Sequence, residues 1–171
     1  MKRLVTLMAV LAFGLTTTYA QKFAYVDTEY ILEKIPDYTA AQKQIEQLST
    51  QYQSAIEAEA KKVDQLFKNY QAERGRLSEA QRQQREADII NKEQAVKDLQ
   101  KSYFGQDGTV TKRSETLMQP IKDRVQRAID AIAKEGGYAV IFDISAAPGF
   151  IFTNPVYDLS NRVLEKLGIK I

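Results

Sequence analysis

Two aspartates stand where paired carboxylates could do chemistry. Asp27 ends a predicted strand near the start of the chain, and Asp143 ends another one late in the chain. If these strands pair in parallel, the two carboxylates lie close together, as paired catalytic carboxylates do. The alternative is that each aspartate caps the element that follows it. We favour capping, because Asp is a good helix cap and no pocket-forming residues accompany the pair.

The sequence offers few of the residues that other kinds of enzyme chemistry require. The sequence contains no Cys, no His and no Trp. It therefore lacks the commonest zinc ligands, cysteine nucleophiles and histidine bases. It also lacks the glycine-rich motifs that bind nucleotide phosphates. We expect no metal site, no cofactor, no ATP use, no disulfide bond and no enzyme activity.

A second cluster of side chains is basic. The segment 67–86 carries five basic residues against three Glu. These residues are either ordinary solvated charge or a site for an anionic surface, such as lipid head groups or lipopolysaccharide. Nucleic acid is not an expected partner, because the segment is too poor in aromatic residues to stack on bases. The basic residues are Lys68, Arg74, Arg76, Arg82 and Arg85.

Two long helices position this cluster. Helical spacing of apolar residues predicts one helix from Thr39 to about Glu73 and a return helix from Glu79 to about Phe104. Gly75 breaks the pattern, and Ser78 to Gln81 has the form of a capping box. The short connection predicts an antiparallel hairpin whose basic residues meet at its tip. Each helix is roughly 40–50 Å long at 1.5 Å per residue, so the hairpin must project from the body as an arm.

The apolar stripes of both helices are narrow. In most positions they are the seam between the two helices. Phe67, Tyr70 and Tyr103 could instead face a space shared between the arms of an oligomer. The stripes consist of Ala41, Ile45, Leu48, Tyr52, Ile56, Ala60, Val63, Phe67 and Tyr70 in the first helix, and of Ala80, Ala87, Ile90, Val96, Leu99 and Tyr103 in the second.

Glycines interrupt the return helix at residues 105–108. Because Gly disfavours helix, the segment Gly105–Gly108 is either a plain loop or a hinge between the arm and the body. Helix resumes around Thr111, where Pro120 either kinks it or marks a fresh start. This helix ends at Gly136 and Gly137.

The body is made from both ends of the chain. We predict a strand over 22–27, a short helix to Lys34, and a strand over 138–143 that is buried on both faces. A turn at 147–149 leads to a second strand, 149–153, in a hairpin with it. Asp158 is expected to cap a last helix that ends at Gly168. The side chains of this helix that are expected to face the core are Leu159, Val163, Leu164 and Leu167.

A body of about 80 residues without disulfides is near the size at which one core is marginal. Its fully apolar strands therefore predict an obligate oligomer with the sheets at its centre.

The first twenty residues read as an export signal. Lys2 and Arg3 precede an apolar run from Leu4 to Leu15, and small residues favour cleavage after Ala20. The apolar run is short against the ~20 residues that a membrane span needs. Removing the signal changes the charged residues from 24 basic and 22 acidic to 22 of each, because Lys2 and Arg3 are lost.

Three segments resemble the Skp/OmpH family of periplasmic chaperones: "FAYVDTEYILEKIPDY", "LMQPIKDRVQRAIDAIAKEGGYAVIFD" and "NPVYDLSNRVLEKLGI". The resemblance implies a jellyfish-shaped homotrimer whose helical tentacles enclose a cavity. It also implies a periplasmic, ATP-independent holdase for unfolded outer-membrane β-barrel proteins. Some family members bind lipopolysaccharide. Positive charge near the tentacles helps family members engage anionic membranes and clients, and the basic tip fits that property loosely.

The sequence thus predicts an α+β fold with a small β-rich oligomerisation body. The signal covers 1–20, the body 21–38 and 109–171, and the hairpin tentacle 39–108. Two other functions stay open. One is a coiled-coil spacer or adaptor of the cell envelope, and the other is an exported enzyme that uses Asp27 and Asp143.

Overall fold

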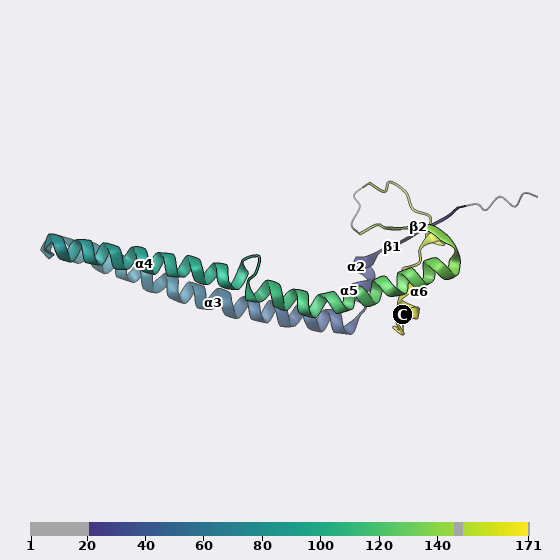
Figure 1. Ribbon diagram of the computed structural model, residues 1–171, viewed down its shortest axis with the longest axis horizontal. Coiled ribbons are helices and arrows are strands. Elements are labelled where there is room, and N and C mark those ends of the chain that lie inside the picture. The colour runs from purple at the N-terminus through teal and green to yellow at the C-terminus, as the bar shows by residue number, and fades with distance from the viewer. Residues whose placement is uncertain (1–20, 146–148, 171) are drawn as a thin grey trace, which may run out of the picture.

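The computed structural model describes residues 21–145 and 149–170. The predicted signal at 1–20 and most of the predicted turn at 147–149 lie outside these ranges. The described chain is mostly helical, with a long helical hairpin and a small sheet (Figure 1). Its elements are β1 (Lys22–Val26), α2 (Thr28–Glu33), α3 (Pro36–Glu73), η1 (Arg74–Arg76), α4 (Glu79–Phe104), α5 (Thr109–Gly136), β2 (Tyr138–Asp143), η2 (Pro155–Tyr157) and α6 (Ser160–Lys166).

The hairpin follows its sequence signals closely. Ser78 accepts a hydrogen bond from the backbone N–H of Gln81, whose side chain accepts from the backbone N–H of Ser78. The predicted capping box is therefore confirmed. The predicted start of α3 at Thr39 is wrong, because the helix begins at Pro36. Proline is tolerated in the first turn, where its missing N–H has no helical partner to lose.

Helix α3 is longer than the helix that returns beside it. It has 38 residues against 26 in α4. The outer part of α3 therefore packs on α4 and its inner part on α5, which continues beyond the loop at 105–108 (Figure 1). Helix α5 runs unbroken through Pro120, so a fresh start there did not occur. It ends where Gly137 adopts a φ of 65°, a left-handed conformation that suits glycine.

The sheet consists of two parallel strands. β1 pairs with β2 so that Ala24 lies beside Ile141 and Val26 beside Asp143. The predicted strand at 149–153 is wrong, since no other strand joins this sheet in the described residues. Within 21–145 and 149–170 this segment pairs with no strand, and its residue Ile151 is fully exposed. Burial of both faces of β2 is also wrong for the single chain, because Ala139, Val140 and Phe142 are exposed.

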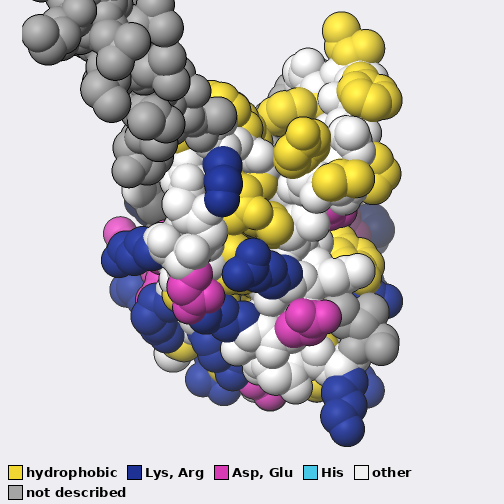
Figure 2. Space-filling model, turned by 90° about the vertical axis from the view of Figure 1, so that its right-hand side faces the viewer, with side chains coloured by type: hydrophobic (Ala, Val, Ile, Leu, Met, Phe, Trp, Pro, Cys, Tyr) yellow, Lys and Arg dark blue, Asp and Glu magenta, His cyan; other side chains and the backbone are white. Residues whose placement is uncertain are grey.

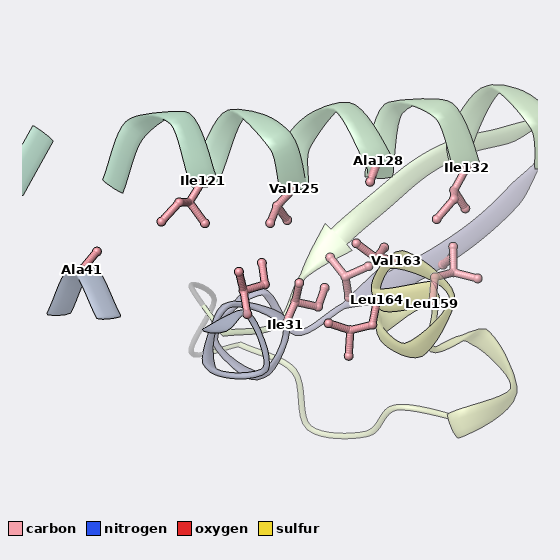
Figure 3. Packing of buried hydrophobic residues seen from close by; sticks show 12 residues of the cluster. Ile31, Ala41, Ile121, Val125, Ala128, Ile132, Leu159, Val163 and Leu164 are labelled. Carbon is pink, nitrogen blue, oxygen red and sulfur yellow. The ribbon is translucent and has the colours of Figure 1, made fainter. Parts of the chain in front are cut away.

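The core lies between α5 and the small elements of the body. Figure 3 shows side chains of α5 pointing toward Ile31 of α2 and Leu164 of α6. The inward positions predicted for α6 are confirmed at Leu159, Val163 and Leu164, which are buried, whereas Leu167 is partly buried. The helix begins at Ser160 rather than directly after Asp158, whose carboxylate accepts from the backbone of Ser160. The most deeply buried side chains are Ile31, Ile35, Ile132, Val163 and Leu164.

No helix within 21–145 and 149–170 combines the length and the apolar character that a membrane span requires.

Replacing Ile132 by Ala tests this core. Ile132 is 0% exposed, so the truncation leaves a cavity and should lower the free energy of unfolding by about 2–5 kcal/mol. Ile90→Ala is the matched control, because Ile90 is 62% exposed and lies in the middle of a helix. Urea unfolding followed by circular dichroism measures both variants. Equal midpoints for the two would contradict the placement of the core.

Candidate functional site

The seam of the arm follows a seven-residue repeat. In α3 the repeat brings Ile56, Val63 and Tyr70 toward α4, and in α4 it brings Ile89 and Val96 toward α3. Such spacing keeps one narrow stripe of each helix against its partner. The seam is therefore thin, and most of the arm's side chains are exposed.

Two apolar residues that the sequence placed in the stripes lie beside the seam instead. Leu66 and Ile89 occupy seam positions, whereas Phe67 is 46% exposed and Ile90 is 62% exposed. The two interpretations differ by one residue, which rotates a side chain by about 100° around the helix. A spacing of 3 and 4 is satisfied by either register, and only the partner helix selects between them.

Tyr103 belongs to the seam. Its ring stacks on Tyr52 of α3 with centroids 3.9 Å apart and an angle of 9° between the ring planes. This pair joins the two helices next to the loop at 105–108. Tyr103 thus contacts the opposite helix of its own arm.

Tyr70 is a second link across the seam, close to the tip. Its side chain is 5% exposed, and its hydroxyl donates a hydrogen bond to the carboxylate of Glu86. This hydrogen bond raises the pKa of Tyr70, and burial adds to the effect, while Arg74 opposes it. The phenol is held neutral as a donor, so the link persists at neutral pH.

The basic cluster at the tip is interleaved with acidic residues. Lys68 pairs with Asp64 at 2.6 Å, and Arg85 lies 3.9 Å from Glu73 on the other helix. Arg82 lies 3.6 Å from Glu79 and also donates to the carbonyl of Leu77 at 3.2 Å. Exposed ion pairs of this kind contribute little free energy, so they restrain the basic side chains only weakly.

Arg74 and Arg76 form the turn itself, in η1, and both are exposed. The structure therefore brings all five predicted basic residues to the outer part of the arm.

The two aspartates serve as caps. Asp27 accepts from the backbone N–H of Tyr30 at 3.0 Å, as the N-cap of α2. Asp143 accepts from the backbone of Thr28 at 3.2 Å and from its hydroxyl at 2.6 Å. Burial opposes ionisation of Asp143, but hydrogen bonds from Thr28 and Ser145 outweigh it and lower the pKa of Asp143. Parallel pairing does bring both aspartates to one end of the sheet, where their oxygens bind the start of α2.

The described residues contain no group of three or more acidic side chains that could hold a metal ion.

The segment Gly105–Gly108 forms a tight loop. The backbone N–H of Gly108 donates to the carbonyl of Gly105 at 2.9 Å, and the hydroxyl of Thr111 donates to the same oxygen at 2.9 Å. A Cβ at either glycine would collide with a backbone carbonyl, that of Lys101 or that of Tyr103. Close packing explains both glycines, and a hinge at this loop stays a prediction.

Aromatic residues gather on an open face of the body. Figure 2 shows hydrophobic side chains clustered at that end of the molecule. Phe142 of β2 contacts Phe23 of β1 and Phe150, with ring centroids 6.5 and 5.6 Å apart. Together with Tyr25 they line a hollow of about 700 Å³. Apolar patches of this kind mark contact surfaces on soluble proteins.

Comparison with known proteins places the chain. A family model described as outer membrane protein (OmpH-like) matches residues 22–167. The chain belongs to the OmpH-like family. The predicted resemblance to the Skp/OmpH family is thereby confirmed. A search of curated proteins found no significant match.

A solved structure has the same fold. It is the crystal structure of a protein from Caulobacter crescentus CB15 that is described as a candidate outer membrane chaperone (OmpH-like). The two chains are 14% identical and superpose with a TM-score of 0.65 over 92% of this chain and 90% of the other. The hairpin and small sheet therefore form the expected OmpH-like fold.

The link between Tyr70 and Glu86 predicts a titration at alkaline pH. Glu86→Gln should bring the pKa of Tyr70 down toward its ordinary value of 10.0, because the charged acceptor is lost. Since the folded pKa is raised, the link stabilises the folded arm below pH 10 and is lost as the pH rises through the raised pKa. Ultraviolet absorbance measures tyrosinate formation against pH.

Glu93→Gln is the matched control, because it removes the same charge from the same helix. The two variants should differ, and identical tyrosine titrations would contradict the link.

Proposed function

We propose that this protein is an ATP-independent holdase chaperone of the periplasm that binds unfolded outer-membrane β-barrel proteins and prevents their aggregation. Membership of the OmpH-like family is the observation that carries the proposal. The arm supports the holdase proposal. A long hairpin with a thin seam leaves many side chains exposed, and these can make many weak contacts with an unfolded chain. Holding of this kind needs neither nucleotide nor cofactor.

The proposed assembly is a homotrimer joined through the body. The aromatic face around Phe142 is exposed in the single chain, and covering it in a partner removes apolar area from water. Three bodies joined in this way would carry three arms, which would surround a cavity. In this proposal 21–38 and 109–171 form the body and 39–108 the tentacle.

The client would lie against the arms. Of the three apolar residues proposed for this contact, Phe67 is exposed in the closed hairpin, whereas Tyr70 and Tyr103 are engaged in the seam. Tyr70 and Tyr103 would therefore reach a client only when the seam opens. Affinity would be spread over many residues, so no single one is decisive.

Export supports the proposed location. The signal pattern at 1–20 directs the chain to the periplasm, with cleavage after Ala20. The remaining chain carries equal numbers of basic and acidic residues, so contact with anionic surfaces depends on local clusters.

The first experiment measures holding directly. A urea-unfolded β-barrel membrane protein is diluted into buffer with and without residues 21–171, in the absence of nucleotide, and light scattering is followed. We expect aggregation to be suppressed at about one oligomer per client, because the arms of one assembly enclose one chain. Serum albumin at equal mass is the control for non-specific protection.

Aggregation at the rate of the control, with a folded and oligomeric chain, would overturn the holdase proposal. Binding to one folded envelope protein at fixed stoichiometry would then favour the spacer or adaptor.

The tip is proposed as a contact for anionic lipid or lipopolysaccharide. Reversing Arg74, Arg76, Arg82 and Arg85 to Glu should weaken binding to phosphatidylglycerol vesicles by roughly tenfold or more at low salt, since each basic residue near the surface contributes to attraction. Co-sedimentation measures the binding. The control reverses four exposed residues of α5 instead, namely Lys112, Lys122, Arg127 and Lys134. Equal losses in both variants, or binding that ignores salt, would contradict a tip site.

A further inference from the structure

The proposed removal of the export signal exposes a reactive residue. Cleavage after Ala20 leaves Gln21 as the first residue of the mature chain. An N-terminal glutamine carries a free α-amine and a side-chain amide on the same residue. Ring closure between these two groups gives a five-membered lactam, which is called pyroglutamate.

The surroundings of Gln21 leave both groups free to react. Strand β1 begins at Lys22, so Gln21 lies outside the ladder of the sheet, and its side chain is exposed. The ring would be built only from atoms of residue 21. Closing it therefore leaves the pairing of Lys22 with Tyr138 and the rest of the ladder in place.

The first strand begins directly after this residue. The side-chain amine of Lys22 donates a hydrogen bond to the carbonyl of Gly136 at 3.0 Å, at the end of α5, where a helix favours a cation. Ala24 and Val26 of the same strand are buried in the core of the body. A peptidase that trimmed the chain from its amino end would soon remove this contact and then the strand.

We propose that Gln21 is a modification site that cyclises to pyroglutamate once the signal is removed, and that the lactam protects β1 from aminopeptidases. Aminopeptidases recognise a free α-amine, which the lactam lacks. The proposal rests on the proposed export of the chain and its cleavage after Ala20.

The reaction needs no group beyond residue 21. The α-amine reacts as its free base, and its ordinary pKa of about 7.7–8.0 leaves a fraction of it uncharged at neutral pH. Its nitrogen attacks Cδ of the side chain, so a new C–N bond forms and the bond from Cδ to Nε2 breaks. Ammonia leaves with the proton that the amine gives up. The class of enzyme that would accelerate this step is a glutaminyl cyclase of the cell envelope.

Mass spectrometry tests the modification. The full chain, residues 1–171, is produced in a bacterium that exports it, and the mature protein is purified from the cell envelope. We expect a chain that starts at residue 21 and is lighter by one ammonia. Cleavage at acidic residues should locate the loss in the peptide 21–27.

Two controls accompany this measurement. Gln21→Asn keeps the amide but lacks one methylene, so closure would require a four-membered ring, and this variant should lose no ammonia. The second control is residues 21–171 released from a fusion in vitro and carried through the same handling. It should remain mostly uncyclised.

The outcomes separate this inference from the proposed export. A retained signal, or a mature chain that starts at another residue, contradicts cleavage after Ala20 and overturns the inference with it. A chain that starts at residue 21 with its ammonia retained overturns only the inference. Equal cyclisation in the chain released in vitro would show that the ring forms during handling, which also overturns it.

Digestion tests the protection. The folded protein from the cell envelope is incubated with an aminopeptidase, and its intact mass is followed. The unsubstituted chain should stay whole, whereas the Gln21→Asn variant should lose residue 21, because only the variant keeps a free α-amine. Urea unfolding checks that both chains are equally stable before digestion. Equal trimming of the two would overturn the protective role.

Pyroglutamyl peptidase gives the opposite readout. It removes only a cyclised first residue, so it should shorten the unsubstituted chain by one residue and leave the Gln21→Asn variant intact. Shortening of both chains, or of neither, would contradict a lactam at residue 21.

Discussion

The parallel pairing of β1 with β2 is the constraint on which the rest of the structure depends. Parallel neighbours cannot be joined by a tight turn, so the chain must return to the same end of the sheet through a crossover. Here the crossover comprises α2 through α5, and most of it forms the projecting arm. The arm is therefore one very long connection, which begins and ends in the body and is held there by the core that α5 forms with α2 and α6.

A thin seam follows from the same arrangement. Helices that only have to stay side by side need one narrow apolar stripe each, and the seven-residue repeat provides it. Two contacts across the seam support the stripe: Tyr52 stacks on Tyr103 beside the loop at 105–108, and the hydroxyl of Tyr70 donates to Glu86 near the tip. α3 runs without a break past the loop at 105–108, so it aligns α4 and α5 along one axis. The outer surfaces of both helices are left free for other molecules.

The body leaves more of its apolar surface exposed in the single chain than the seam of the arm does. A two-stranded sheet leaves edges and a face without partners, and isolated pairs of strands are marginal in water. The aromatic side chains around Phe142 stay exposed in one chain, although the residues beneath them are well buried. A body of this kind is consistent with a subunit that completes its core by association.

The sequence by itself determined the helical hairpin, its turn and the caps of its helices. These features depend on residues that are close in the sequence, such as Ser78 with Gln81, or Gly137 after α5. Interactions between such neighbours can be predicted from the sequence alone. The apolar run at 138–143 likewise predicted a strand. The resemblance to the OmpH-like family rested on the segments that flank the arm, and these were also readable from the sequence.

Only the tertiary structure decided which residues face the seam and which face outward. Phe67 and Leu66, or Ile90 and Ile89, satisfy helical spacing equally well, and the partner helix selects one of each pair. The segment 149–153 reads as a strand, but a strand exists only when it pairs with a neighbour, and in the described residues this segment pairs with neither β1 nor β2. Long-range partners are invisible to local pattern, because the free energy that selects them comes from contacts between residues far apart in the chain.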